Sequence, residues 1–173
     1  MTIVDALRTA TGHISSKYFL LRVAGMEYPI KRERAYCYEL YHQLRLALAG
    51  TELVLTGEPD KKRHPAFEGE RKPNPDFILH TPGSHRHNGS AVEVECTPTL
   101  SHLTKDLGTL KQMRSKGYQE LVLLLFAVNR VPWLDLARAA EATGINLSDI
   151  AVLLHTAADQ QATVEHAPPK YAA

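Results

Sequence analysis

The sequence predicts an α/β domain with a mixed sheet that helices cover. Two long segments, residues 31–50 and 100–117, repeat apolar residues three or four positions apart, as on one face of a helix, and a third helix is expected at 131–144, with Pro132 near its start and Gly144 after its end. Short apolar runs bounded by turn residues lie between and after them. One of these runs, LVLLLFAV at 121–128, is apolar throughout, which is typical of a strand covered on both faces. Helical and strand patterns that follow one another in this way predict an α/β sheet.

The predicted elements follow in a definite order along the chain. A weakly helical start at 1–15 and a short strand at 17–25 precede the strong helix at 31–50, which has no internal glycine or proline and stops at Gly50. Strands are expected at 51–57, 76–80 and 90–96, then a helix at 100–117 and a strand at 118–129. A helix at 131–144 and a strand at 149–156 form an additional C-terminal αβ unit.

Length and composition indicate one ordinary globular domain. The chain has 173 residues, 44% of them apolar and 23% charged, with a formal net charge of +1. We take residues 1–157 as the domain and expect residues 158–173, which are polar and contain proline, to form a loose tail. The longest apolar run is too short to cross a bilayer, and no basic-then-apolar signal begins the chain, so we expect a cytoplasmic protein with no membrane partner.

Three acidic residues flank the two middle strands, which we expect to form an antiparallel hairpin. Positions 76 and 93 average to the Gly83–His85 loop, so Asp76 should lie opposite Glu93, with Cβ atoms roughly 4.5–5.5 Å apart. Glu95 shares a face of its strand with Glu93. Carboxylates that converge in this way repel one another unless a cation lies among them, and hard oxygen ligands favour Mg²⁺ or Mn²⁺. We therefore predict a divalent metal site, although a merely solvated acidic face is the alternative.

These motifs resemble those of the PD-(D/E)XK nuclease superfamily. The segment ERAYCYELYHQLR would carry the first motif, Pro75-Asp76 opens the second predicted strand, and Glu93-Val94-Glu95 ends the third. The order expected for residues 31–128 is similar to the αβββαβ core of that superfamily, the restriction-endonuclease-like fold. The resemblance implies catalytic roles for Asp76, Glu93 and Glu95, with Asp76 and Glu93 holding the metal.

The third motif departs from the family pattern, since Glu95 stands where the family has lysine. The resemblance implies either that glutamate serves there, or that Lys61, Lys62, Lys105 or Lys111 supplies the amine. If neither holds, the chain is an inactive relative.

The acidic residue from the first long helix has two candidates. Glu33 falls among the apolar residues of that helix on a helical wheel, whereas Glu39 lies nearer to the first strand in sequence. Either residue is a candidate for the catalytic acid of this helix.

Basic residues cluster around the motifs although the whole chain is nearly neutral. They would form a rim that holds a phosphate backbone, the alternative being ordinary solvated surface. The candidates for nucleic-acid binding are Arg32, Lys61, Lys62, Arg63 and Lys72.

The leading functional hypothesis is a Mg²⁺- or Mn²⁺-dependent nuclease that hydrolyses phosphodiester bonds of DNA. By analogy with enzymes of the resembled fold we also expect a homodimer. The main alternative is a catalytically inactive module of the same fold that binds DNA or a protein partner. A more distant one is an interaction protein without a nucleic-acid role.

Overall fold

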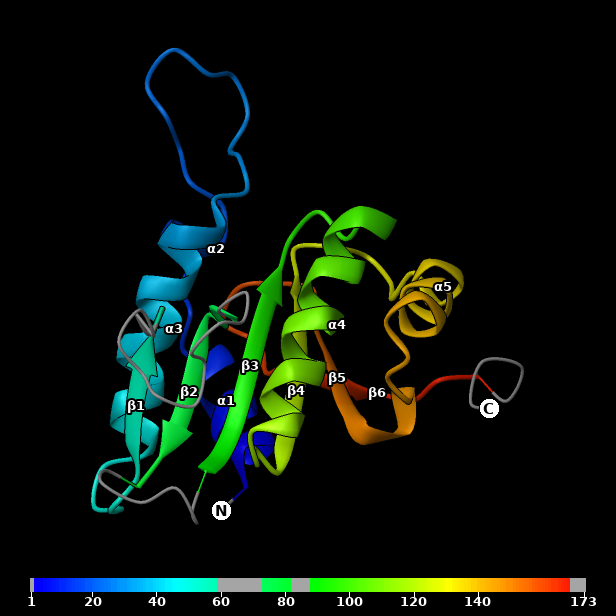
Figure 1. Cartoon of the computed structure of the whole chain (residues 1–173). Coiled ribbons are helices and arrows are strands. Elements are labelled where there is room, and N and C mark those ends of the chain that lie inside the picture. The colour runs from blue at the N-terminus through cyan, green and yellow to red at the C-terminus, as the bar shows by residue number, and fades with distance from the viewer. Residues whose placement is uncertain (1, 59–72, 82–87, 169–173) are drawn as a thin grey trace.

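The fold is built on one open, six-stranded mixed sheet (Figure 1). A computed structural model describes residues 2–58, 73–81 and 88–168. The strands lie in the order in which they occur in the sequence. The pairs β3–β4 and β4–β5 are parallel and the other three pairs are antiparallel. The strands are β1 (Val54–Gly57), β2 (Phe77–His80), β3 (Asn88–Glu95), β4 (Glu120–Phe126), β5 (Ile150–His155) and β6 (Thr163–Glu165).

Helices cover both faces of this sheet (Figure 1). One face packs against α1 (Ile3–Thr11), α2 (Ser16–Phe19) and α3 (Glu33–Ala47), and the other against α4 (Leu100–Ser115) and α5 (Trp133–Thr143). A short 3₁₀ turn, η2 (Leu147–Asp149), leads into β5. The predicted α/β class and the order α3-β1-β2-β3-α4-β4 followed by an αβ unit are therefore confirmed.

Alternation along β3 assigns its side chains to two separate cores. Val92 and Val94 belong to the core under α1 and α3, whereas Ala91 belongs to the core under α4 and α5. Glu93 and Glu95 share the α4 side of the strand with Ala91, because side chains two apart point to one face. The acidic residues of β3 therefore face a helix rather than open solvent.

The register of the β2–β3 hairpin agrees with the sequence prediction. Phe77 pairs with Val92 and Ile78 with Ala91, so one further step places Asp76 opposite Glu93. The register shifts between Leu79 and His80, and residues 82–87 lie outside the described residues.

The predicted strand at 17–25 is wrong. Residues Ser16–Phe19 form the short helix α2, and beyond it Leu21 makes only an isolated bridge with Ile30. Phe19 decides the outcome because its ring is buried edge-on against Tyr36 and Phe126. The loop between Leu21 and Ile30 extends away from the sheet (Figure 1).

The predicted loose tail is wrong for its middle part. Residues Thr163–Glu165 form β6, which pairs antiparallel with β5. Helix α1 holds the approach to this strand: the Ala162 N–H donates to the Thr11 hydroxyl at 2.9 Å, and Arg8 Nε donates to the Ala162 carbonyl at 3.2 Å. These contacts are between residues more than 150 positions apart, so local polarity gave no sign of them.

Membrane insertion has no support among the helices. In the described part of the chain, none is long and apolar enough to span a bilayer.

Candidate metal centre

The predicted acidic residues meet at one end of the sheet. At this end β3 and β1 finish, β2 begins, and both α3 and α4 have their first turns. Asp76 immediately precedes β2, Glu93 and Glu95 close β3, and Glu33 opens α3. The αβββα order of the chain therefore brings four carboxyl groups together from three separate elements.

Asp76 and Glu93 form a directly interacting pair. Asp76 Oδ2 accepts a hydrogen bond from the Val94 N–H at 2.7 Å, which fixes its carboxyl group against β3. Glu93 is 3% exposed, and its Oε1 atom has no hydrogen-bond partner among the described residues. A buried oxygen without a partner costs stability, so this atom is the clearest sign of a missing ligand.

Burial and mutual repulsion control the protonation of this pair. Desolvation raises the pKa of Glu93 well above its ordinary value, and the charges of Asp76 and Asp106 raise it further. Desolvation raises the pKa of Asp76 too, although the Val94 hydrogen bond opposes that shift. Without a cation, a protonated Glu93 donates to Asp76, because two adjacent buried carboxylates do not both ionise readily.

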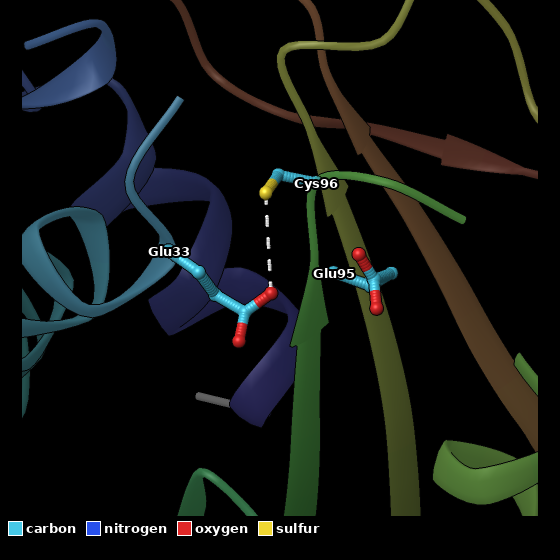
Figure 2. A group of neighbouring side chains, drawn as sticks. All are labelled: Glu33, Glu95 and Cys96. Atoms are coloured by element: carbon cyan, nitrogen blue, oxygen red, sulfur yellow. Dashed lines mark hydrogen bonds between the residues drawn. The ribbon is translucent and has the colours of Figure 1, made fainter. Parts of the chain in front are cut away.

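A second group lies beside the first, made of Glu33, Glu95 and Cys96 (Figure 2). One carboxylate oxygen from each glutamate and the Cys96 sulfur all lie within 4.8 Å of one another. The Cys96 thiol points to Glu33 Oε2 at 4.0 Å. Desolvation, followed by the charges of Asp76 and Glu95, raises the pKa of Glu33 to about 7. These three residues could hold a metal ion.

The chemistry of this second group favours its oxygen atoms as ligands for a hard cation. Burial raises the pKa of the Cys96 thiol, so its sulfur stays protonated at neutral pH and is a poor ligand in that form. Glu33 and Glu95 supply carboxylate oxygens, which Mg²⁺ and Mn²⁺ prefer.

Glu95 has a different environment from the one the sequence predicted. Its Oε2 lies 3.0 Å from His102 Nδ1 on α4, and its Oε1 accepts a hydrogen bond from the Thr97 N–H. Asp76, Glu93 and Glu95 therefore do not close into one three-carboxylate group in the described structure; Glu95 belongs with Glu33 instead. The tight turn after β3 is the reason, because the Thr97 amide pulls the Glu95 carboxylate towards the end of the strand.

Helix α4 contributes a lysine and an aspartate whose charges act on the acidic cluster. Lys105 Nζ lies 3.5 Å from Asp106 Oδ1, and its charge lowers the pKa values of Glu33, Asp76 and Glu93. Lys61 and Lys62 lie outside the described residues; of the two remaining candidates for the family lysine, Lys105 is thus the one whose charge acts on the acidic cluster. Lys111 is engaged elsewhere, with its Nζ 2.6 Å from the Thr143 carbonyl.

Asp106 is a component that the sequence reasoning missed. It is 3% exposed, and its Oδ2 has no hydrogen-bond partner in the described part of the chain. Desolvation raises its pKa to about 7, against the opposing charge of Lys105. A signal was present: Asp106 lies among Leu103, Leu107 and Leu110 on the buried stripe of α4, where an acid needs an explanation.

The remaining predicted site residues fall in different places. Glu39 lies two turns along α3 and accepts from Gln43 Nε2 at 2.7 Å, so Glu33 is the α3 acid that joins the cluster. Arg32 precedes α3 and is exposed. The other predicted basic residues, Lys61, Lys62, Arg63 and Lys72, lie outside the described residues.

Comparisons of the chain with protein-family models, curated proteins and solved structures gave no match. The resemblance to the PD-(D/E)XK superfamily therefore stays a prediction.

Proposed function

We propose that this chain is a divalent-metal-dependent nuclease that hydrolyses phosphodiester bonds of DNA. The observation that carries the proposal is the Asp76–Glu93 pair, with a buried, unpartnered Glu93 oxygen. This pair gains stability when a cation displaces the proton that Glu93 shares with Asp76 and supplies a partner to the Glu93 oxygen.

The residues present fit a hard divalent cation such as Mg²⁺ or Mn²⁺. Asp76 and Glu93 would hold it, and Glu33, whose pKa the Asp76 charge helps to raise, is a further carboxylate close by. Such an ion supplies Lewis-acid polarisation of a phosphoryl oxygen and a lower pKa for a bound water.

Lys105 suits the role of the lysine that the third motif lacks. Its pKa is raised by Asp106, Glu93 and Asp76, which outweigh the opposing desolvation, so its amine stays protonated at neutral pH. A protonated amine cannot accept a proton from water. We therefore assign Lys105 to holding a phosphate oxygen or orienting the attacking water, rather than to general-base catalysis.

Glu95 and Glu33 suit different roles. Glu95 is held by the Thr97 N–H and faces His102, which favours a fixed, orienting role. Glu33, with a pKa of about 7, can exchange a proton near neutral pH.

A second candidate function is a catalytically inactive module that binds DNA or a protein partner. The observation in its favour is that both Glu95 oxygens already have partners, Thr97 and His102, in the position where the family has lysine. Under this candidate the cluster binds a cation without turnover.

A homodimer and a cytoplasmic location are further parts of the proposal. Size-exclusion chromatography and localisation of the tagged protein would test them.

The test is cleavage of plasmid and linear DNA with Mg²⁺ or Mn²⁺. We expect the wild type and a Glu39→Ala control to cut DNA. Asp76→Ala should be inactive although it is folded to the same extent as the wild type. Equal cleavage by wild type and Asp76→Ala would remove the proposed site. No cleavage by any variant, with DNA binding that persists in EDTA, would favour the inactive module.

A further inference from the structure

A pocket opens directly beside the acidic cluster. Its volume is about 500 Å³, and it lies between α3 and the adjacent ends of β1 and β2. Tyr38 and Tyr41 of α3, Gly57 of β1, and Asp76 and Phe77 all contribute to its wall. This volume lies within the range of about 300–1,000 Å³ that small-molecule sites occupy.

The wall of the pocket is aromatic. The Tyr41 and Phe77 rings are nearly parallel, with an interplanar angle of 28° and centroids 6.4 Å apart. Phe77 is 2% exposed and belongs to the core, so the accessible aromatic surface is that of Tyr38 and the half-buried Tyr41. Tyr38 is 67% exposed, so its ring is available at the rim without supporting the core. The described lining residues include the acids Glu58 and Asp76 but no lysine or arginine, so the pocket disfavours a phosphate and suits a planar group without negative charge.

Glycine at position 57 keeps this pocket open. A Cβ atom there would lie 3.6 Å from the Tyr41 ring and 3.7 Å from the Phe77 ring. A longer side chain would therefore extend between the two rings. The backbone at position 57 has no positive φ, so it would accept a residue other than glycine. The effect of glycine at this position is therefore to leave space between the two rings.

Asp76 connects the pocket to the acidic cluster. It lines the pocket and also pairs with Glu93. A substrate whose phosphate reaches the carboxylates would thus place its neighbouring group at the mouth of the pocket. In a nucleic acid that neighbour is a sugar carrying a planar base.

We infer that the pocket receives an unpaired nucleobase adjacent to the phosphate at the acidic cluster, so that the substrate class is DNA with single-stranded segments. This rests on the proposed function and names its substrate. A base inside a duplex is stacked and paired on both sides and cannot enter without being extruded. Aromatic side chains can stack on any of the bases. We therefore expect the protein to prefer unpaired over paired DNA, without a preference for base sequence.

The experiment measures binding rather than cleavage. Fluorescence anisotropy, with Ca²⁺ in place of Mg²⁺, compares a short single-stranded oligonucleotide with the blunt duplex of the same sequence. A 2-aminopurine base in the single strand reports stacking through loss of emission. The variants are Tyr38→Ala, which removes the exposed ring, and Gly57→Leu, which fills the pocket. The matched control is Tyr28→Ala, another tyrosine that is 71% exposed but lies in the 20–31 loop.

The expected result is a single-strand preference of about tenfold or more in the wild type, with quenched 2-aminopurine, as stacking on one aromatic ring provides. Tyr38→Ala and Gly57→Leu should lose most of that preference while their duplex affinity stays unchanged, and Tyr28→Ala should keep it. Equal affinities in the wild type, unquenched emission, or a preference that survives both variants would overturn the inference.

The two proposals can fail separately. Single-strand preference that depends on Tyr38 in a protein that never cleaves DNA would remove the nuclease but support the base pocket. Metal-dependent cleavage of duplex and single-stranded DNA at equal rates, insensitive to Tyr38→Ala, would support the nuclease and remove the pocket.

Discussion

Helix α3 contributes to two buried polar regions that differ in the charge they hold. One turn separates Glu33, in the acidic cluster, from Tyr36, in the core. Tyr36 is fully buried, stacks on Phe126 with ring centroids 3.8 Å apart, and forms a hydrogen bond of 2.8 Å to His155 Nδ1. Burial lowers the pKa of His155 to about 4, so this pair is neutral at physiological pH.

The difference between the regions separates stability from function. The Tyr36 region buries neutral groups that pack on aromatic rings, and Tyr36 bonds to His155 Nδ1, which is how a folded core becomes stable. His155 Nε2 has no hydrogen-bond partner among the described residues, but its ring is uncharged at physiological pH. The acidic region buries carboxyl groups that repel one another, and two of its oxygens have no partner among the described residues. A protein keeps such an arrangement when a ligand compensates for it.

The largest expected effect is on stability at Tyr36. Tyr36→Ala should lower the free energy of unfolding by about 3–5 kcal/mol, because it leaves a cavity against Phe126 and an unpaired His155. Tyr36→Phe keeps the packing and should cost only about 1–2 kcal/mol. Urea denaturation measures both, and equal losses would show that the hydrogen bond, not the ring, dominates.

In the acidic region, a substitution should greatly reduce cleavage and hardly change stability. Glu93→Gln should reduce metal-dependent cleavage by at least roughly 100-fold, the scale seen when one electrostatic group is lost from an active site. Its free energy of unfolding without metal should change by about 1 kcal/mol or less, since Glu93 is already protonated there. A variant that unfolds readily and still cuts DNA would reverse the contrast.

A pH dependence of stability should arise from the same region. Glu33 and Asp106 have folded pKa values of about 7, above ordinary values of 4.5 and 3.8, so the native state binds protons that the unfolded chain has released. Stability without divalent ions should therefore fall as the pH rises towards and through 7. His155 acts in the opposite direction, but only between about 4 and 6.5, where its folded and unfolded pKa values lie.

The measurement is the free energy of unfolding in EDTA from pH 6.5 to 8, for the wild type and for Glu33→Gln. The variant should show a shallower fall, and Glu39→Gln, as the matched control, should follow the wild type. Identical slopes in all three proteins would mean that Glu33 ionises normally.

The smallest expected effect is at the exposed margin of the cluster. Arg34 Nη2 lies 3.7 Å from Glu58 Oε1, and both side chains are more than half exposed. Arg34→Ala should change stability by no more than about 1 kcal/mol, and less at high salt, because solvent screens such pairs. A larger loss in thermal denaturation would mark this ion pair as part of the site.

The sequence predicted those parts of the fold and site that depend on local periodicity. The Asp76–Glu93 register followed from the two-residue period of strands and the midpoint of a short loop. The helices α3, α4 and α5 followed from apolar spacing and terminal glycines.

The parts that depend on distant contacts were not predictable in this way. Strand β6 depends on contacts of Thr11 and Arg8 with Ala162. Helix α2 depends on the burial of Phe19 between α3 and β4. The separation of Glu95 from Asp76 depends on a turn amide at Thr97, and the choice of Glu33 over Glu39 depends on where α3 meets the sheet end.

The central claim is that the acidic end of the sheet binds a divalent cation through Asp76 and Glu93. An anomalous difference map from a crystal soaked in Mn²⁺ tests it most directly. We expect a peak coordinated by these two carboxylates, with Glu33 next to it, and no peak in a Glu93→Gln crystal soaked in the same way. A wild-type map with no peak at this end of the sheet, or with manganese bound elsewhere, would contradict the account.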